Sequence, residues 1–570
     1  MAVAVLTSLA EPLSVVEDDN RHARGAFFTP QAIADFLASW AIRTPDATVL
    51  DPTCGESVFL IAAGRHLRTL GADLSHLDSQ VYGIDLHAPS LDASVALLTE
   101  MGLDAHLTAE DVFDVPTPDQ LGCPLPLMDA VVGNPPFVRY QEHRGEARRR
   151  SVQAALRQGV RLSGLASSWA SVVIHASGFL KPDGRLAMVL PAELLTVHYA
   201  EPVRQWLRNR FSGVTLVMFE RLQFEDALEN VVLLLAHGSG GCDSFQLKYV
   251  SDASDLAQLQ FGDAISVLPA SQGKWTDLLL PISQRRLYRQ AVEKSFVPLD
   301  TYGSPTLGTV TGGNDFFTLS DATKEEFGLR EEHLKKICPP GTRHLRSLSF
   351  GMGDWNQLRE AGERVWLLHP EPTHRSAGLQ RYIAFGKSQG IDSAYKCQIR
   401  SPWWRPPAVA VPDLFFTYMS HRYPRLIANT ARVSFVNSMH GLRLKKEAPA
   451  QAKAALPLLM LNSVTMLGAE VVGRSYGGGI LKMEPREAAA LPLPKPNCLA
   501  AAWEILRPER DALNRQLQNG LWTNVVARVD EVLLRQVLGL STDDGCTLHG
   551  AARDLRARRL TRGTPADGDA

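Results

Sequence analysis

Val49-Leu-Asp-Pro-Thr-Cys-Gly55-Glu-Ser-Val-Phe59 joins a short apolar run to a helical pattern through a tight turn. A buried strand, a turn and a helix in this order form one βα unit of a parallel sheet. The loop that follows such a strand is where open α/β sheets bind their ligands. The loop is not a G-x-G-x-x-G sequence and no Lys-Ser/Thr follows Gly55, so it favours neither a dinucleotide site nor a phosphate-binding P-loop.

The same alternation of strand and helix continues over the first 240 residues. It predicts an α/β fold with a doubly wound, Rossmann-like sheet of seven strands. The expected strands are 48–51, 81–85, 105–109, 128–132, 185–190, 214–219 and 231–236, with helices at 57–70 and 89–101.

The rest of the chain has a different character. Pro, aromatic residues and short strand-like pieces dominate 300–500, and apolar spacing from 501 onward is helical. We therefore expect an N-terminal extension (1–20), a doubly wound domain (21–245), a connecting segment (246–299), a mixed α/β domain (300–500) and a helical C-terminal segment (501–570) with a frayed tail.

Composition excludes several classes of protein. Of the 570 residues, 45% are hydrophobic and 21% are charged, which is typical of globular chains and not of disordered ones. No apolar run reaches the length of a membrane span, and the N-terminus lacks the basic start of a signal peptide, so we expect no membrane association. The seven cysteines are scattered without a C-x-x-C pair, which favours reduced thiols in the cytoplasm.

Three carboxylates follow successive predicted strands. Asp51 and Asp85 end the first two, and Asp111 follows the third. Asp85 has the spacing of a residue that accepts both ribose hydroxyls, although a helix N-cap is the alternative. Asp111 could accept from an adenine amino group, with Val112 or Phe113 against the ring. Such a set suits an adenosine with a positively charged appendage, because a triphosphate would need cations that these loops lack.

The fourth strand leads into Gly133-Asn134-Pro135-Pro136-Phe137. An exocyclic amine on an aromatic ring is a poor nucleophile, since its lone pair is delocalised into the ring. The Asn134 side-chain oxygen and the Pro135 carbonyl could accept from the two amine hydrogens and localise that lone pair. The two prolines would hold both acceptors in place, and Phe137 offers a face for base stacking. A plain turn is the alternative for the tripeptide alone.

Together these segments resemble the gamma class of S-adenosylmethionine-dependent DNA adenine-N6 methyltransferases of restriction–modification systems. That class has a G-x-x-x-T-P segment first, which is here Gly25-Ala-Phe-Phe-Thr29-Pro30, and a target-recognition domain last. The resemblance makes 21–245 the methyltransferase domain and 300–500 the DNA target-recognition domain. Two departures are Glu56-Ser57, where a second glycine is commoner, and Phe137, where tyrosine is commoner.

The resemblance implies roles at matching positions, with S-adenosylmethionine as the cofactor and no metal. Residues that border the cofactor would be Thr29, Asp51, Pro52, Thr53, Cys54, Gly55, Asp85, Leu86, Asp111, Val112, Asn134 and Pro136. Asn134, Pro135 and Phe137 would carry catalysis, and Phe137 and Phe224 would sandwich an adenine rotated out of the duplex.

Net charge is −2, but 381–446 holds eleven Lys/Arg against two Asp/Glu, and a second basic cluster spans 139–161. Such segments favour a nucleic-acid surface over a merely solvated face. The residues chosen as DNA contacts are Arg139, Lys396, Arg400, Arg405, Arg443 and Lys445. Trp403 and Trp404 are more typical of a core than of a wedge between bases. We expect a bacterial protein that binds double-stranded DNA as a monomer in the nucleoid, with a cognate restriction endonuclease as a candidate partner.

Other functions remain open at this point. Asn-Pro-Pro-Phe also serves methyltransferases that act on RNA or on protein glutamine, but Thr29-Pro30 and the long C-terminal portion favour DNA. A cytosine-C5 enzyme would need a Pro-Cys dipeptide, which is absent, and cytosine-N4 enzymes typically have Ser or Asp at position 134. A DNA-binding subunit of a larger restriction complex is the alternative without catalysis. We expect no fused nuclease ahead of Gly25.

Overall fold

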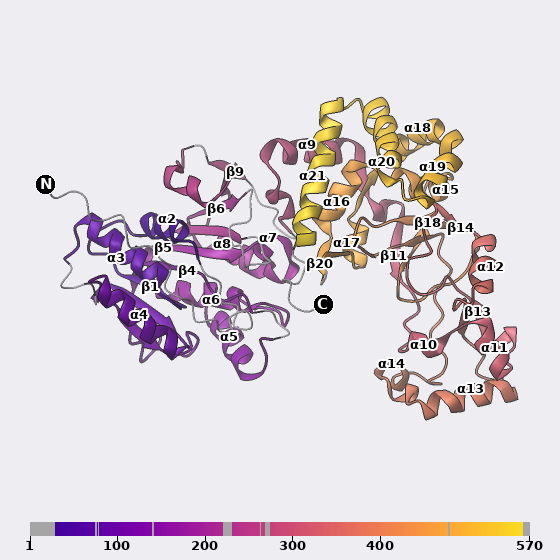
Figure 1. Cartoon of the computed structure of the whole chain (residues 1–570), viewed down its shortest axis with the longest axis horizontal. Coiled ribbons are helices and arrows are strands. Elements are labelled where there is room, and N and C mark those ends of the chain that lie inside the picture. Colours follow the sequence, from indigo (N-terminus) through magenta and orange to yellow (C-terminus); the bar gives the residue numbers. More distant parts are fainter. Residues whose placement is uncertain are drawn as a thin grey trace. The chain divides into compact units, whose positions relative to one another are not determined.

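The computed structural model describes residues 29–73, 77, 79–138, 142–219, 231–262, 264–267, 274–476 and 479–561. The chain divides into two compact units, unit 1 (Met1–Trp275) and unit 2 (Thr276–Ala570). Each unit has its own sheets, helices and buried residues (Figure 1).

Unit 1 is built on a nine-stranded sheet with the order β3-β2-β1-β4-β5-β7-β6-β8-β9. The strands β1 to β5 run parallel to their neighbours within this set, and β7 is antiparallel to both β5 and β6. Their bounds are β1 (Val49–Asp51), β2 (Val81–Asp85), β3 (His106–Ala109), β4 (Met128–Gly133), β5 (Leu180–Pro191), β6 (Gly213–Phe219), β7 (Val231–His237), β8 (Phe245–Val250) and β9 (Ile265–Val267).

The predicted α/β class is confirmed, and all seven expected strands are present. Chain order reverses between β1 and β4, which are neighbours, and ligands of open α/β sheets bind at such a switch point. Two further strands, β8 and β9, extend the sheet into the stretch that the sequence assigns to a connecting segment, because β8 pairs in parallel with β6.

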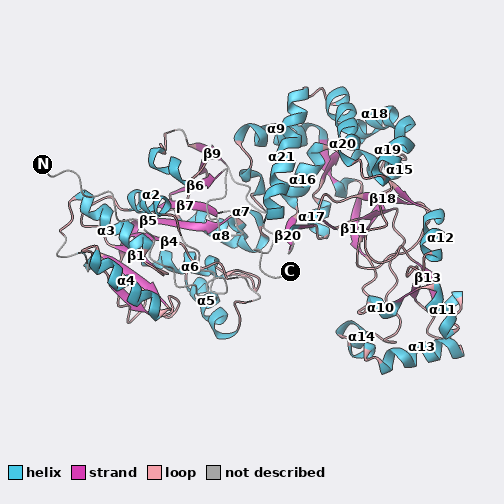
Figure 2. Ribbon diagram, in the orientation of Figure 1, coloured by secondary structure: helices cyan, strands magenta, loops and turns pink. Residues whose placement is uncertain are grey.

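In unit 1 the chain alternates between strands of the sheet and helices that pack on it (Figure 2). In this unit α2 packs on α3, β4 and β5, and α5 packs on α6. The described helices are α2 (Gln31–Ala41), α3 (Val58–Leu70), α4 (Ala88–Glu100), α5 (Gly145–Arg157), α6 (Ser168–Ala176), α7 (Glu193–Thr196) and α8 (Glu201–Arg210).

The described part of unit 2 contains four small sheets, of which three are antiparallel and one, the five-stranded sheet, includes a parallel pair. Their orders are β10-β22, β11-β19-β16-β18-β14, β12-β15-β13 and β17-β21-β20. The bounds are β10 (Phe296–Pro298), β11 (Gly303–Leu307), β12 (Thr318–Leu319), β13 (Leu334–Lys336), β14 (Ser349–Phe350), β15 (Trp366–Leu368), β16 (Leu414–Phe416), β17 (Met419–Ser420), β18 (Leu426–Asn429), β19 (His440–Leu444), β20 (Arg474–Tyr476), β21 (Ile480–Lys482) and β22 (Pro492–Pro494).

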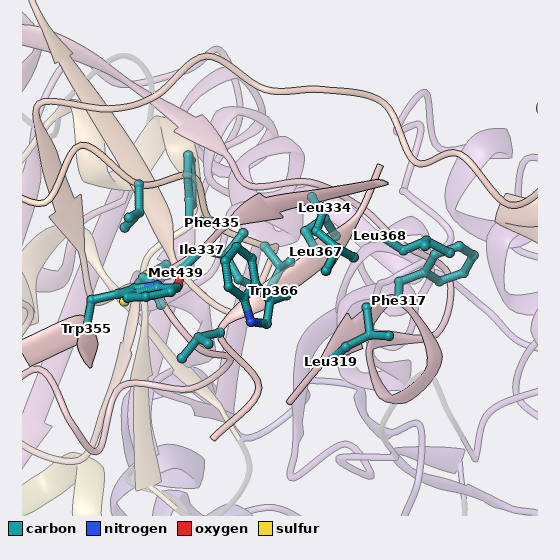
Figure 3. Packing of buried hydrophobic residues seen from close by; sticks show 14 of the residues in the cluster. Phe317, Leu319, Leu334, Ile337, Trp355, Trp366, Leu367, Leu368, Phe435 and Met439 are labelled. Atoms are coloured by element: carbon teal, nitrogen blue, oxygen red, sulfur yellow. The ribbon is translucent and has the colours of Figure 1, made fainter. Parts of the chain in front are cut away.

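Aromatic and aliphatic side chains fill the centre of this mixed region (Figure 3). The rings of Trp355 and Trp366 meet edge to face, and the indole of Trp355 donates a hydrogen bond to the Ile337 carbonyl. Burial of such rings stabilises the region although its strands are only two to five residues long.

The helices of unit 2 are α9 (Ile282–Ser295), α10 (Asn314–Phe317), α11 (Asp321–Phe327), α12 (Met352–Glu360), α13 (Ala377–Ser388), α14 (Tyr395–Gln398), α15 (Ala452–Leu459), α16 (Ser463–Val472), α17 (Pro485–Ala489), α18 (Pro496–Leu506), α19 (Arg510–Gln518), α20 (Trp522–Asp530) and α21 (Thr542–Thr561). In the described part of the chain no single helix is long and apolar enough to cross a membrane, although the bent pair α15 and α16 passes that test together.

The expected frayed tail is wrong for 553–561, where α21 continues as a regular helix. The reason is a buried ion pair between Arg559 on α21 and Glu470 on α16, whose side chains are 5% and 3% exposed. Arg559 Nε and Nη2 each lie 2.8 Å from a carboxylate oxygen, so the pair is bidentate. An isolated sequence pattern cannot reveal this contact.

Candidate active site

Four polar segments meet at the carboxyl edge of the parallel strands in unit 1. β1 ends at Asp51 and β2 at Asp85, while Asp111 and Asn134 follow β3 and β4 closely. These four strands are neighbours in the order β3-β2-β1-β4, so their ends share one edge of the sheet. The structure therefore brings together the segments on which the sequence analysis relied.

The loop after β1 is fastened to the loop after β2. The backbone N–H of Gly55 donates to one oxygen of Asp85, and the N–H of His87 donates to the other, both at 2.8 Å. Each carboxylate oxygen keeps a second lone pair that can accept from a ligand hydroxyl. Gly55 has φ +50°, and a Cβ built on it would meet nothing within 4 Å, so open space adjoins this turn.

Ser57 belongs to the Glu56-Ser57 pair that stands where a second glycine is commoner, and its backbone adopts a conformation that glycine favours. It is a non-glycine residue in the left-handed region, with φ +65°, directly before α3. The loop thus keeps a conformation that glycine adopts more easily, at a cost of about 1–3 kcal/mol. Its side chain does not cap α3, and its buried Oγ has no hydrogen-bond partner in the part of the chain described.

Asp51 is the buried carboxylate of this edge. It is 1% exposed, and its Oδ1 accepts from the Thr53 N–H at 3.1 Å. A Cβ built on Gly133 would lie only 2.7 Å from that oxygen, so glycine is required beside it. Burial, with a smaller contribution from Asp85, raises the pKa of Asp51 to about 8. A cation bound here would favour its ionised form.

The corner at Asn134 is held by Thr29 and leaves one buried acceptor without a donor among the described residues. The Asn134 amide donates from Nδ2 to Thr29 Oγ1 at 3.1 Å, and Thr29 is 3% exposed. The side-chain oxygen Oδ1 is buried, and no described residue donates to it. The Pro135 carbonyl also accepts no hydrogen bond from the described residues. Two acceptors from one rigid corner are therefore open to a ligand with two N–H hydrogens.

Two serines that the sequence analysis missed hold this corner in place. Ser168, at the start of α6, donates from Oγ to the Pro136 carbonyl and accepts from the Val138 N–H at 2.9 Å. Ser167 donates from Oγ to the Val138 carbonyl at 2.7 Å. The only available signal is a Ser-Ser pair ahead of a helix, some 30 residues after the corner.

Asp111 has two partners within unit 1, a backbone N–H of its own loop and an arginine of α5. Asp111 Oδ1 accepts from the Phe113 N–H at 3.1 Å, and its Oδ2 lies 3.3 Å from Arg150 of α5. Arg150 also pairs with Asp114. Within the basic cluster 139–161, Arg150 and Arg149, the latter through Glu146, therefore have acidic partners in the protein itself.

His175 of α6 holds the same segment through two of its main-chain carbonyls. Its Nε2 lies 2.9 Å from the Val112 carbonyl and 3.1 Å from the Val115 carbonyl. The histidine is completely buried, and this burial lowers its pKa, so the ring is neutral and donates to both carbonyls. Val112 itself is 6% exposed.

The remaining predicted residues fall into two groups. Pro52, Cys54 and Phe137 are buried, whereas Leu86 beside Asp85 is 73% exposed. Burial raises the pKa of the Cys54 thiol, which stays protonated. Arg139 and Phe224 lie outside the described residues.

The basic residues chosen in unit 2 behave differently from one another. Lys396 and Arg443 are exposed. Arg405 donates from Nε to the Pro370 carbonyl at 2.8 Å and pairs with Glu371, and Lys445 pairs with Asp300 at 3.3 Å. Arg400 donates from Nε to the Trp403 carbonyl at 2.6 Å. Three of these five cations are therefore tied to the protein itself.

Of the two tryptophans at 403–404, Trp403 contacts two phenylalanine rings. The Trp403 ring lies 5.7 Å from that of Phe316 and 6.4 Å from that of Phe317, centre to centre. Both phenylalanines are buried. Trp403 is half-buried and packs against the hydrophobic core of this region.

Comparison with known proteins adds the family. The profile of the N-6 DNA methylase family matches residues 13–212, and that of the C-terminal domain of the type II methyltransferase M.Eco57I matches residues 272–534. The chain belongs to the N-6 adenine DNA methyltransferases. It is of the restriction–modification type, so the family and the enzyme class expected from the sequence are confirmed. This family uses S-adenosylmethionine and acts on DNA.

Two relatives of this family match over most of the chain. The type II methyltransferase M.AccI of Acinetobacter calcoaceticus is 22% identical over 487 residues, which cover 82% of this chain and 85% of the relative. M.XamI of Xanthomonas campestris pv. amaranthicola is 22% identical over 484 residues, with the same coverage. Among solved structures, the type IIG restriction endonuclease BpuSI is 14% identical with a TM-score of 0.45, and the match covers 95% of this chain and 67% of that one.

Proposed function

We propose that this methyltransferase transfers the methyl group of S-adenosylmethionine to the exocyclic amine of an adenine rotated out of double-stranded DNA. The observation that carries the proposal is the buried Asn134 Oδ1 without a partner among the described residues, beside the open Pro135 carbonyl. A buried acceptor without a donor costs about 1–3 kcal/mol, and a bound amine would remove that cost.

The residues at the sheet edge fit the cofactor. Asp85 would accept from the ribose hydroxyls, and Asp111 with Val112 would hold the adenine ring of the cofactor. Asp51 and Thr29 would border its methionine part, where the ionised Asp51 suits a cation. When bound, the cofactor supplies a methyl group on a positively charged sulfur.

The Asn134 corner would then make the target amine reactive. With one N–H donated to Asn134 Oδ1 and the other to the Pro135 carbonyl, the nitrogen lone pair turns away from the ring and toward the methyl group. The amine nitrogen would take the methyl group with its own lone pair, and the electron pair of the broken carbon–sulfur bond would remain on the sulfur. The methylated nitrogen would then give up one proton. The prolines and Ser168 keep both acceptors fixed, so little reorganisation is needed.

The target base would stack on Phe137, with Phe224 as the second face. Such contacts offset part of the cost of base rotation, on the order of 1–3 kcal/mol each. We assign methyl transfer to 21–245 and target recognition to 300–500. The protein would act as a monomer on DNA in the bacterial cytoplasm, with a cognate endonuclease as a candidate partner.

The product identifies the function. Purified protein, unmethylated bacterial DNA and methyl-labelled S-adenosylmethionine are incubated, and the nucleosides are analysed by mass spectrometry. The proposal expects label in N6-methyladenine. Label in N4-methylcytosine, or label in RNA or protein but not in DNA, would refute it.

A further inference from the structure

Arg150 of α5 brings a guanidinium to Asp111, at the edge of the sheet where the cofactor is expected. Its Nη2 lies 3.3 Å from Asp111 Oδ2, and its Nη1 donates to Asp114. Its Nε–H is buried, and no residue in the described part of the chain accepts from it. A buried donor without an acceptor costs free energy, so this N–H is a candidate contact for a ligand.

Arg559 shows how the same side of a guanidinium is used when no ligand is involved. The hydrogen on Nε and one hydrogen on Nη2 leave the group side by side, and Arg559 donates both to Glu470, each over 2.8 Å. Arg150 instead gives its two terminal nitrogens to two different carboxylates. Its Nε–H is therefore left over, next to the nitrogen that borders Asp111.

The packing of α5 holds Arg150 in this place. Ser151 and Ala154 of this helix are 1% and 0% exposed, and α5 packs on α6 (Figure 1). The helix α6 also carries His175, which bonds to the Val112 carbonyl in the loop after β3. The guanidinium and the loop predicted to hold the cofactor's adenine thus share one support, so the position of the Nε–H is set before a ligand binds.

We propose that Arg150 and Asp111 together recognise the adenine ring of the bound cofactor, an inference that rests on the proposed function. Asp111 accepts from the amine of the ring, and the Arg150 Nε–H donates to a ring nitrogen beside that amine. Adenine has such a nitrogen on each side of its amine, N1 and N7, so an acceptor next to a donor complements either edge. A base with an oxygen in place of the amine would instead set an acceptor against the Asp111 carboxylate.

The test measures affinity by calorimetric titration for S-adenosylhomocysteine and three analogues of it. Two analogues have a carbon in place of N1 or of N7, and the third has hypoxanthine in place of adenine. The unaltered protein is compared with Arg150→Met, which keeps the length of the side chain but removes its donors. The matched control is Arg149→Met, which removes the neighbouring arginine, whose side chain is 58% exposed and pairs with Glu146. The melting temperature reports whether each variant is folded.

The inference expects Arg150→Met to bind S-adenosylhomocysteine about tenfold more weakly than the unaltered protein does. For one of the two carbon-substituted analogues, the unaltered protein should show an affinity about tenfold below that for S-adenosylhomocysteine, and Arg150→Met should lose this preference. The analogue concerned identifies the ring nitrogen that Arg150 contacts. The hypoxanthine analogue should bind weakly to the unaltered protein, and Arg149→Met should keep all affinities of the unaltered protein.

An Arg150→Met variant that keeps both preferences among the analogues would overturn the inference. If its affinities all fell by the same factor, Arg150 would only orient Asp111, and if they were unchanged, Arg150 would have no part in binding. Failure of the proposed function looks different. An unaltered protein that binds S-adenosylhomocysteine but leaves no N6-methyladenine in DNA would refute the function, and the affinity ratios would still decide the inference. An unaltered protein that binds no S-adenosylhomocysteine would overturn both.

Discussion

The carboxyl edge of the sheet in unit 1 and the basic segment of unit 2 use their polar groups in opposite ways. In the first, buried polar atoms such as Asn134 Oδ1 and Ser57 Oγ are left without partners among the described residues. In the second, cations that look available in the sequence, such as Arg400 and Arg405, are consumed by the protein itself. Unsatisfied groups mark where a ligand binds better than charge does, because leaving a buried group unpaired costs free energy.

The largest effect should come from the support of the catalytic corner. Ser168→Ala removes the hydroxyl that bridges Pro136 and Val138, and a corner displaced by even 1 Å is expected to lower kcat about 100-fold. Binding of S-adenosylmethionine and DNA should hardly change. The matched control is Ser177→Ala, which removes a buried hydroxyl bonded to Ile174 after the same helix. Equal kcat for both variants would show that Ser168 does not position the corner.

The buried Asp51 predicts a pH dependence. Because its pKa is raised to about 8, the ionised form grows as pH rises, and the cationic donor favours that form. Affinity for S-adenosylmethionine should therefore rise about tenfold between pH 6.5 and 9. The affinity of Asp51→Asn should stay low and flat, while exposed Asp104→Asn should follow the unaltered protein. Calorimetric titration measures this, and a flat profile in the unaltered protein would contradict the assignment.

The same shift affects stability with a defined sign. The native state holds the Asp51 proton up to about pH 8, while an unfolded carboxyl loses it near pH 4, so unfolding releases a proton in this window. The free energy of unfolding of the ligand-free protein should fall as pH rises between these values. Urea titrations of Asp51→Asn should lack that component.

Among the cations of unit 2, exposure should separate DNA contacts from structural ones. Arg443→Gln, at an exposed position of β19, is expected to weaken duplex binding about fivefold and to lower the salt slope by about one. Arg405→Gln should leave the slope unchanged and instead lower the melting temperature, since it loses its bonds to Pro370 and Glu371. The reverse pattern would show that pairing within the protein does not exclude DNA contact.

The smallest effect is expected at Ser57. Ser57→Gly should raise the free energy of unfolding by about 1 kcal/mol, because glycine adopts a φ of +65° without strain. Ser57→Ala keeps the strain and serves as its control, so it should not gain stability. Equal stabilities of both variants in denaturant titrations would show that the left-handed conformation is not strained.

Much of the sheet, and the place of the polar segments along its edge, could be predicted from local sequence. Strand ends such as Asp85 follow from short apolar runs, and the rigidity of Asn134-Pro135 follows from covalent geometry. A few consecutive residues set each of these features. The order of the strands then places the residues together.

The rest depends on contacts between distant residues, which no local pattern encodes. Ser168 meets the corner from 30 residues away, and Arg150 reaches Asp111 from the next helix. The sequence predicts a frayed end, but Arg559 in the last helix pairs with Glu470, which lies 89 residues earlier in the chain. Side-chain packing decides such pairs, so a basic or polar residue in the sequence does not show whether it faces DNA or the protein.

The central claim is that two fixed acceptors make the adenine amine reactive, and Asn134→Ala tests it most directly. Single-turnover methylation is measured on a duplex that contains a sequence methylated by the unaltered protein. Affinities for the cofactor and for this duplex are measured as well. The account predicts a loss of at least about 10²–10³-fold in the rate of methyl transfer, with both affinities within about twofold of the unaltered protein. A variant that methylates at the unaltered rate would contradict it.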